Sequence, residues 1–378
     1  MAKRAGLQYN LLIMKPYRLA FLFSFLILLV VSCAPSGSLM EPRSEYVMGT
    51  ICTINLFEKG SPELYSEVFA RLRELEDILS ANREGTDLDK VNQNAGQMPV
   101  KVRPELIELL GTALVYAERT KGALDPTIGP LVKLWGIGTE SAHVPPVDEI
   151  RKAQSLIGYH DVEINREAGT VFLKRPGMAL DLGSVGKGYA ADVIDKLLTA
   201  KGVKRAMVDL GGNIFAMGEK AARESPGERI KDLLPGSSGK DKNDDGSYWR
   251  VGVQDPRTNR GNYIGILKVK NKTVVTSGVY ERFFIEGGKR YHHIFNIETG
   301  YPAENGLLST TIVSDSSTDA DALSTATFVL GWERGSELIA SVGGAEGIFV
   351  SDDLSVRVTP GLGNVFALTA AEYHLANP

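Results

Sequence analysis

The stretch Ala179-Leu-Asp-Leu-Gly-Ser-Val-Gly-Lys-Gly-Tyr-Ala-Ala-Asp192 joins an apolar segment to a helix through three glycines. The apolar residues Met178–Leu182 predict a short strand, and the helix is expected to begin at about Lys187. A strand, a glycine-rich turn and a helix start aim several backbone N–H groups at one point, which suits a phosphate. Lys187 adds a positive charge, and Asp181 lies at the strand end, where site residues usually project. An ordinary strand-to-helix turn explains the same residues equally well.

The first 32 residues are predicted to be a signal peptide. Basic residues precede an apolar run, Leu19–Val31, which is too short to span a bilayer comfortably and ends close to Cys33. The pattern resembles a bacterial lipoprotein signal, in which Cys33 becomes the lipidated, palmitate-bearing N-terminus; a secretory peptide and an uncleaved anchor are the alternatives. Residues 33–44 then form a flexible tether. We therefore expect a lipid-anchored protein on the periplasmic side of a bacterial membrane.

Residues 45–378 are long enough for one elaborated domain with a large core. The full chain has 42 Lys and Arg against 46 Asp and Glu, so no basic field points to nucleic acid. Without Cys33, the remaining Cys52 has no partner for an intramolecular disulfide. Residues 219–247 are charged and poor in large apolar side chains, which predicts an exposed insertion.

Helical and strand patterns follow one another through this domain. Helices are predicted after Ser61, after a cap at Asp87–Asp89, over 105–120, over 145–158 and after a cap at Ser317, Thr318 or Asp319. Strands are predicted over Tyr46–Phe57, in a hairpin over 162–174, and over 207–210, 249–254, 263–269, 273–276 and 282–285.

Two later segments carry candidate chemistry. The adjacent His292 and His293 stand between strand-forming residues and point to opposite faces, so at most one serves a given site. An imidazole near a phosphate could move a proton. On the last helix, Asp321 and Thr325 share a face, and a carboxylate with a hydroxyl matches the oxygen ligands of Mg²⁺. A surface histidine and a capped amphipathic helix would explain the same residues.

Together these segments resemble the bacterial FAD:protein FMN transferase family, over roughly Tyr46 to Thr359. The matching motifs are Met48-Gly49-Thr50, Leu124-Asp125-Pro126, Asp181–Gly188, Asp209–Gly212, Thr276-Ser277-Gly278, His293-Ile294 with Glu298–Gly300, and Asp321–Thr325. The resemblance implies an α+β fold, in which mixed sheets and helices form a single elaborated catalytic domain with an FAD cleft. It also implies Mg²⁺-dependent transfer of the FMN moiety of FAD to a threonine hydroxyl of an acceptor protein, with release of AMP.

The resemblance further implies which residues form the site. Contacts with FAD would come from Met48, Asn82, Ala123, Leu124, Asp125, Asp181, Lys187, His293 and Ile294. The Mg²⁺ ligands would be the Ser184 carbonyl, the Asp321 carboxylate and the Thr325 hydroxyl, with Ser324 nearby. His293 is the first candidate for the catalytic base and Asp321 the second.

Acceptors in the family are flavin-bearing subunits of membrane redox complexes and extracytoplasmic electron-transfer proteins, which fits a lipid-anchored enzyme. One departure is Asn82, at a position where many members carry an aromatic residue. A less closed pocket would admit water, so Mg²⁺-dependent hydrolysis of FAD to FMN and AMP is an alternative. A non-catalytic FAD-binding lipoprotein is another, although such a protein has no need of the Asp321–Thr325 pair.

Overall fold

The computed structural model describes residues 40–220, 246–258 and 261–376, which belong to one compact unit, Met40–Pro378. The predicted signal peptide, Cys33, most of the tether and nearly all of the predicted insertion lie outside the described residues. Among the helices in these ranges, none is both long enough and apolar enough to cross a membrane.

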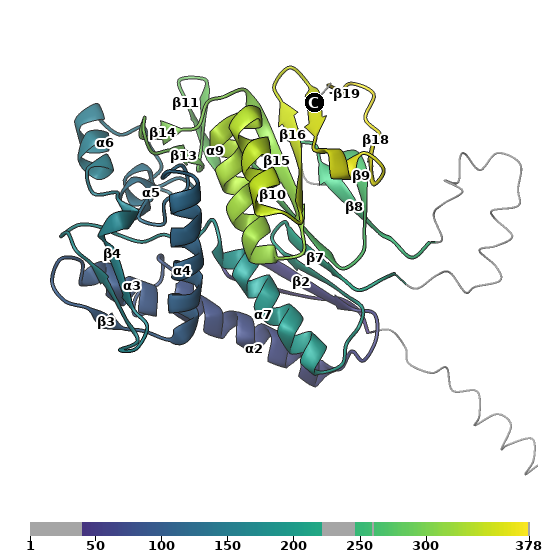
Figure 1. The fold of residues 1–378 in the computed structure, drawn as a ribbon, viewed down its shortest axis with the longest axis horizontal. Coiled ribbons are helices and arrows are strands. Elements are labelled where there is room, and N and C mark those ends of the chain that lie inside the picture. Colours follow the sequence, from purple (N-terminus) through teal and green to yellow (C-terminus); the bar gives the residue numbers. More distant parts are fainter. Residues whose placement is uncertain (1–39, 221–245, 259–260, 377–378) are drawn as a thin grey trace, which may run out of the picture. The chain divides into compact units, whose positions relative to one another are not determined.

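A nine-stranded mixed sheet is the centre of the unit, and with the helices it confirms the predicted α+β class (Figure 1). Its order is β1-β2-β6-β7-β10-β15-β16-β17-β19, with β17 and β19 parallel and the other neighbours antiparallel. The strands are β1 (Arg43–Val47), β2 (Thr50–Leu56), β6 (Ala206–Leu210), β7 (Asn213–Met217), β10 (Lys272–Gly278), β15 (Leu307–Ser314), β16 (Ala345–Ser351), β17 (Ser355–Val358) and β19 (His374–Leu375).

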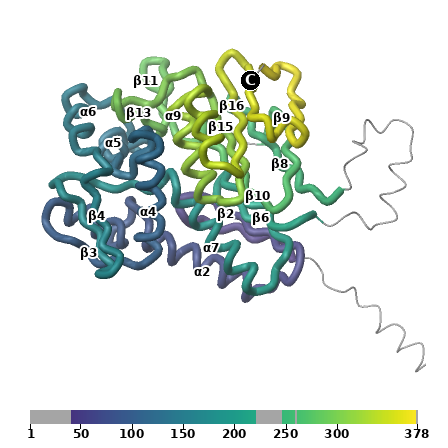
Figure 2. The backbone as a smooth tube through the Cα atoms, viewed as in Figure 1, coloured from purple at the N-terminus to yellow at the C-terminus, as the bar shows by residue number. Residues whose placement is uncertain are grey.

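Helices cover one face of this sheet and a small second sheet covers the other. Figure 2 shows α9 (Ser317–Val342) over β10 and β15, with α7 (Gly186–Ala200) and α2 (Pro62–Leu79) beside it. The second sheet consists of β8 (Trp249–Gln254), β9 (Tyr263–Val269) and β18 (Phe366–Leu368). Because successive strand residues point to opposite faces, Val275 packs in the core under the helices, whereas Val274 packs in the core under the second sheet.

The remaining elements surround α4 (Pro104–Arg119) and the buried Trp135. They are α3 (Asp87–Gln93), α5 (Gly129–Trp135), α6 (Val147–Gln154), β3 (Val100–Lys101), β4 (Val162–Asn165), β5 (Thr170–Leu173), β11 (Phe283–Glu286), β12 (Lys289–His292), β13 (Phe295–Asn296), β14 (Tyr301–Pro302) and the 3₁₀ turn η1 (Tyr159–Asp161). A second 3₁₀ turn, η2 (Pro360–Leu362), lies against β16 instead. The Trp135 ring contacts that of Tyr291 at 5.6 Å between centroids, and its Nε1 donates to the Gly300 carbonyl at 3.0 Å. This cluster fixes the β11–β12 hairpin directly before His293.

The prediction of one strand over Tyr46–Phe57 is wrong, because the segment is the hairpin β1–β2. Met48 and Gly49 both have positive φ, 56° and 69°, as a two-residue hairpin turn of type I′ requires. Glycine takes this conformation without strain, but methionine rarely does. The turn is held from outside, since the Gly49 N–H donates to Glu76 Oε1 on α2 at 3.2 Å.

The strand predicted over Met178–Leu182 is also wrong. Only Ala179 forms an isolated bridge, with Ile128. Both backbone groups of Leu180 bond to the side-chain amide of Asn92, at 2.7 and 3.0 Å, and the Asp181 N–H donates to the Pro126 carbonyl at 2.8 Å. The backbone groups of this extended segment therefore bond to an amide side chain and to a turn, and no neighbouring strand is needed to pair with them.

The predicted helices are present, but two of their caps differ. Thr86 caps α3, where Asp87–Asp89 were expected, and Ser316 caps α9, where Ser317, Thr318 or Asp319 were expected. In each case the hydroxyl lies three residues before the N–H group it accepts, as N-caps do.

Candidate active site

The loop Asp181–Val185 and the first turn of α7 form the base of the candidate site. The Gly183 N–H donates to Asp181 Oδ1 at 2.8 Å, which ties the loop back on itself. The helix begins at Gly186, so its positive end faces the same region as Lys187. Lys187 Nζ donates to the Gly183 carbonyl at 3.4 Å and remains partly exposed.

Helices α7 and α9 are joined by two carboxylates, each of which accepts hydrogen bonds from backbone N–H groups near the N-terminus of the other helix. Asp192 on α7 accepts hydrogen bonds from the N–H groups of Ser317 and Thr318 on α9, at 2.8 and 2.9 Å. In return, Asp321 on α9 accepts from the Gly188 N–H on α7 at 2.9 Å. A Cβ atom at Gly188 would lie 2.1 Å from the Ser317 carbonyl oxygen, so only glycine permits this approach. The two helices therefore hold the Asp321 carboxylate in one orientation.

The predicted metal-binding oxygens lie beside this contact. Asp321 is buried, and its Oδ1 lies 3.7 Å from Lys187 Nζ. The Gly188 N–H donates to Asp321 and not to the Ser184 carbonyl, its usual helical acceptor four residues earlier. The Ser184 carbonyl therefore accepts no hydrogen bond from any described residue. Thr325 follows Asp321 by one helical turn on α9, and its side chain is partly exposed. The set offers a carboxylate, a hydroxyl and a free carbonyl.

Ser277 on β10 belongs to this group, although the sequence analysis gave it no role. Its Oγ lies 2.8 Å from Ser324 Oγ and 3.4 Å from Thr325 Oγ1. Ser324 is fully buried and donates to the Asp321 carbonyl at 2.9 Å. The sequence places Ser277 two residues after Val275, and therefore on the same face of the strand. It does not show which helix covers that face.

The two adjacent histidines differ in their partners. Both ring nitrogens of His292 are used, because Nε2 lies 3.1 Å from the Ala303 carbonyl and Nδ1 accepts from the Ile294 N–H. His293 Nδ1 lies 3.2 Å from the Arg282 carbonyl. A carbonyl oxygen can only accept, so Nδ1 carries the proton and Nε2 is left as an acceptor. The ring keeps some contact with solvent, yet burial and then the charge of Arg282 lower the pKa of His293 to about 3.

Met48 and Asn82 are connected through Glu76. One oxygen of the Glu76 carboxylate accepts from the Gly49 N–H and the other from Arg83 Nη1 at 3.0 Å. Asn82 is exposed, and its backbone N–H donates to Ser80 Oγ. The turn that carries Met48 and the loop that carries Asn82 are therefore held by the same side chain.

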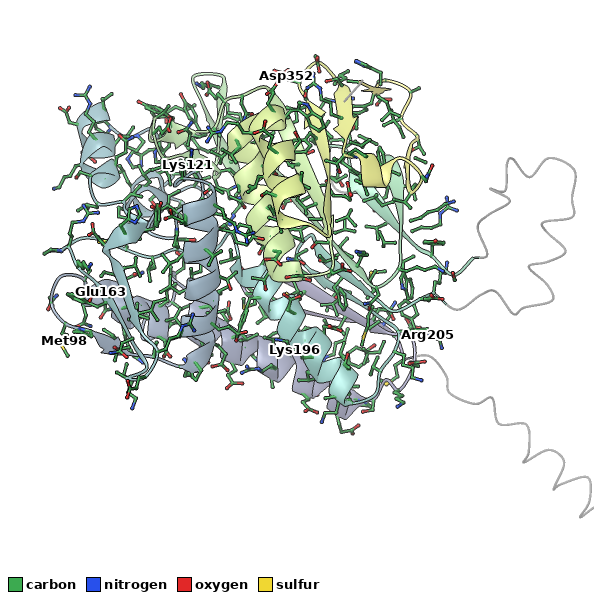
Figure 3. All side chains as sticks on the ribbon, in the orientation of Figure 1. Met98, Lys121, Glu163, Lys196, Arg205 and Asp352 are labelled. Carbon is green, nitrogen blue, oxygen red and sulfur yellow. The ribbon has the colours of Figure 1, made fainter. Side chains whose placement is uncertain are left out.

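Asp125 lies next to the glycine loop but points into the protein. Its Oδ1 accepts from the N–H and the hydroxyl of Thr127, at 2.8 and 2.7 Å, and its Oδ2 accepts from the Tyr159 N–H at 3.0 Å. Burial raises the pKa of Asp125. The Leu124 side chain is buried in the main core, and Ala123 stays partly exposed. Figure 3 labels Lys121, which leads from α4 into this turn with a φ of 53°.

Charges link these groups to one another. Lys187, which contacts Asp321, also lowers the pKa of His293. Burial raises the pKa of the Cys52 thiol to about 12, and the charges of Asp209 and Glu76 add to this while Lys187 opposes it. Asp321, His293 and Cys52 thus lie within electrostatic reach of Lys187. The described residues contain no group of three or more His, Cys, Asp or Glu side chains placed to hold a metal ion.

The chain is similar to known proteins over most of its length. The model of the ApbE family matches residues 48–349. The FAD:protein FMN transferase of Treponema pallidum is 39% identical over 345 residues, which cover 88% of this chain and 91% of that protein. The FAD:protein FMN transferase of Klebsiella pneumoniae is 33% identical, over 83% of this chain and 90% of that protein.

Solved structures show the same fold. A crystal structure of the ApbE protein of Thermotoga maritima has a TM-score of 0.72 at 29% identity, over 85% of this chain and 97% of that one. The flavin transferase ApbE of Vibrio cholerae has a TM-score of 0.68 at 26% identity, over 88% of this chain and 97% of that one. From the family match and these two sets of relatives, the chain belongs to the ApbE family, the family of the FAD:protein FMN transferases.

Proposed function

We propose that this chain transfers the FMN moiety of FAD to a threonine hydroxyl of an acceptor protein, in a Mg²⁺-dependent reaction that releases AMP. The observation that carries the proposal is the Asp321 carboxylate, fixed by the Gly188 N–H beside Lys187 and one helical turn before the Thr325 hydroxyl. The diphosphate of FAD is the part of the substrate that needs such a group of charges.

The residues present fit Mg²⁺. This cation prefers a few hard oxygen ligands and keeps several waters. Asp321 supplies the charge, the Thr325 hydroxyl is partly exposed, and the Ser184 carbonyl accepts no hydrogen bond from the described chain. When bound, the ion would neutralise charge on the diphosphate oxygens. These three residues would hold it.

Lys187 and the N-terminus of α7 would bind the diphosphate together. Lys187 is partly exposed and bound only loosely, at 3.4 Å from Gly183 and 3.7 Å from Asp321, so it can turn towards an anion. The glycine loop lets the backbone approach the phosphates closely. Asp181, whose side chain holds the loop, would keep the loop in place or contact the ribose.

His293 would take the proton of the acceptor threonine. Its Nε2 is the free acceptor, because the Arg282 carbonyl holds the proton on Nδ1. The threonine oxygen would attack the phosphorus on the FMN side, its proton would pass to Nε2, and the AMP oxygen would leave with the electron pair of the broken bond. Burial is the main cause of the low pKa of His293, and the bound diphosphate would offset the smaller contributions from the charges of Arg282 and Lys187. Asp321 is the weaker candidate, since Gly188 and Lys187 already engage its oxygens.

Hydrolysis of FAD to FMN and AMP is the second candidate. The exposed Asn82 supports it, because a small polar side chain beside the Met48 turn would shield the phosphorus from water less than an aromatic one. A lipid anchor at Cys33 would keep either activity outside the cytoplasmic membrane. There the acceptors would be flavin-bearing subunits of redox complexes or electron-transfer proteins.

The test is mass spectrometry of an acceptor domain incubated with the full chain, FAD and Mg²⁺, with AMP and free FMN quantified in parallel. Asp321→Ala serves as the inactive control. A threonine-linked FMN adduct that the control does not form supports the transferase. AMP and free FMN with no adduct on any acceptor tried would favour the hydrolase, and unchanged bound FAD would favour a binding lipoprotein.

A further inference from the structure

Three hydroxyls from two elements meet beside the candidate metal site. Ser277 Oγ on β10 lies 2.8 Å from Ser324 Oγ and 3.4 Å from Thr325 Oγ1, both on α9. Ser277 and Thr325 are partly exposed, whereas Ser324 is fully buried. The sheet therefore reaches the predicted ligand Thr325 through one serine side chain.

The proton of each hydroxyl can be assigned by counting donors. A hydroxyl has one proton and two lone pairs. Ser324 donates its proton to the Asp321 carbonyl at 2.9 Å, so it must accept from Ser277. Ser277 thereby uses its own proton, and towards Thr325 it can only accept. The bonds run in one direction, from Thr325 to Ser277, from Ser277 to Ser324, and from Ser324 to the Asp321 carbonyl.

This direction decides where the lone pairs of Thr325 point. With its proton held by Ser277 on the sheet side, the Thr325 oxygen keeps its lone pairs for the side facing away from the sheet. Each donated bond also makes the donor oxygen a better acceptor, so the chain of bonds strengthens Thr325 as a ligand. Partners behind a metal ligand commonly fix its orientation in this way.

We infer that Ser277 is a positioning residue, which orients the Thr325 hydroxyl for Mg²⁺ through the hydroxyl chain Thr325–Ser277–Ser324–Asp321. The inference rests on the proposed function, because it takes Thr325 as a ligand of the ion. It also gives Ser324 a role as a buried link in the chain, distinct from that of a direct ligand.

Thr276 provides a matched control. It is the neighbour of Ser277 on β10 but faces the other side of the sheet, where its hydroxyl pairs with that of Thr311 at 2.8 Å. Thr276→Val removes a hydrogen bond between two hydroxyls that has the same length as the Ser277–Ser324 bond and starts from the same strand. It leaves the hydroxyl chain of Ser277 intact. Any effect of a lost sheet hydroxyl on stability should therefore appear in both variants.

The experiment measures the dissociation constant of Mg²⁺ by titration calorimetry, using the full chain and MgCl₂. The Mg²⁺ concentration for half-maximal adduct formation is measured in parallel. Ser277→Ala should raise both values about 10-fold, the typical effect of losing a partner behind a ligand. Ser277→Thr, which keeps a hydroxyl, and Thr276→Val should both give the wild-type dissociation constant and the wild-type half-maximal Mg²⁺ concentration. Ser324→Ala breaks the chain at its next link and should act like Ser277→Ala, so the test holds even where Ser277→Ala fails to fold.

The outcomes separate the inference from the function on which it rests. If the wild type forms the adduct with a clear Mg²⁺ dependence and Ser277→Ala behaves like Thr276→Val, the positioning role is wrong and the proposed function stands. If the wild type forms the adduct but neither binds nor responds to Mg²⁺, the metal role and the inference fall together. If no adduct forms but Mg²⁺ binding weakens in Ser277→Ala and Ser324→Ala and not in Thr276→Val, the positioning role stands and the transferase does not.

Discussion

The backbone N–H of Gly188 donates to the Asp321 carboxylate at 2.9 Å, across 133 residues of sequence. This one bond connects the first turn of α7 to the last helix and sets the orientation of the acidic residue on which the proposed metal site depends. Asp192 returns the contact by capping the N-terminus of α9. The geometry of the site is therefore a property of the packing of α7 against α9.

Gly188→Ala is expected to lower the free energy of unfolding by about 2–3 kcal/mol, because its Cβ would meet the Ser317 carbonyl oxygen at 2.1 Å and the helices would have to separate. Urea unfolding measures this. Gly186→Ala is the matched control, since a Cβ there has nothing within 4 Å and alanine favours a helix. Equal stability of the two variants would contradict the close approach.

Asp192→Ala should lower the free energy of unfolding by about 2 kcal/mol, because two N–H groups and the Thr318 hydroxyl lose a charged acceptor at the start of α9. Asp195→Ala, one turn later on α7, is expected instead to raise the free energy of unfolding. Burial and the charge of Asp192 raise the pKa of Asp195, so its ionised form is unfavourable in the folded chain at neutral pH. Thermal unfolding of both variants at pH 7 gives the comparison, and destabilisation by Asp195→Ala would contradict this account.

Much of the fold could be predicted from the sequence, because its signals are local. The apolar spacing after Ser61, Pro104 and Gly186 is helical, and the helices found there are α2, α4 and α7. The two wrong strands depended on distant partners. Asn92, 88 residues from Leu180, satisfies the backbone that looked like a strand. Glu76 on α2 holds the turn that splits Tyr46–Phe57 into a hairpin.

The candidate site, too, could be predicted only where its residues are close together in sequence. Asp321 and Thr325 share a helix face by spacing alone, so their pairing could be predicted. The role of Ser277 could not, because it depends on which helix covers β10. The three hydrogen bonds of Asp125, to its own turn and to Tyr159, could not be predicted from the Leu124-Asp125-Pro126 motif alone. A contact between elements that are distant in sequence carries no periodic signal.

Asp125→Ala is expected to lower the free energy of unfolding by about 2–4 kcal/mol, because three donors would lose a buried acceptor. Asp125→Asn should cost less, since it keeps one oxygen and removes a buried charge. The dissociation constant of FAD, measured by fluorescence well below the unfolding temperature, should stay within about twofold of the wild type in the asparagine variant. A loss of FAD binding with stability retained would show instead that the carboxylate contacts the substrate.

His293→Gln is expected to make the stability of the chain less dependent on pH. Burial and Arg282 lower the pKa of His293 from 6.5 to about 3 in the folded chain. Between these values the unfolded chain binds a proton at this residue and the folded chain does not, so wild-type stability falls as the pH drops below about 6.5. The slope from this residue is at most about 1.4 kcal/mol per pH unit. Urea unfolding at pH 5, 6 and 7 should therefore give a flatter profile for His293→Gln than for the wild type.

The exposed His143 supplies the control for that measurement, since His143→Gln should follow the wild-type profile. The lowered pKa of His292 contributes a slope of its own, but it is present in all three proteins and cancels in the difference. Parallel profiles for His293→Gln and the wild type would mean that folding does not lower the pKa of His293. An imidazole with a pKa near 6.5 would still be mostly unprotonated at pH 7, so Nε2 could still accept the threonine proton, and only the account of burial around the ring would be wrong.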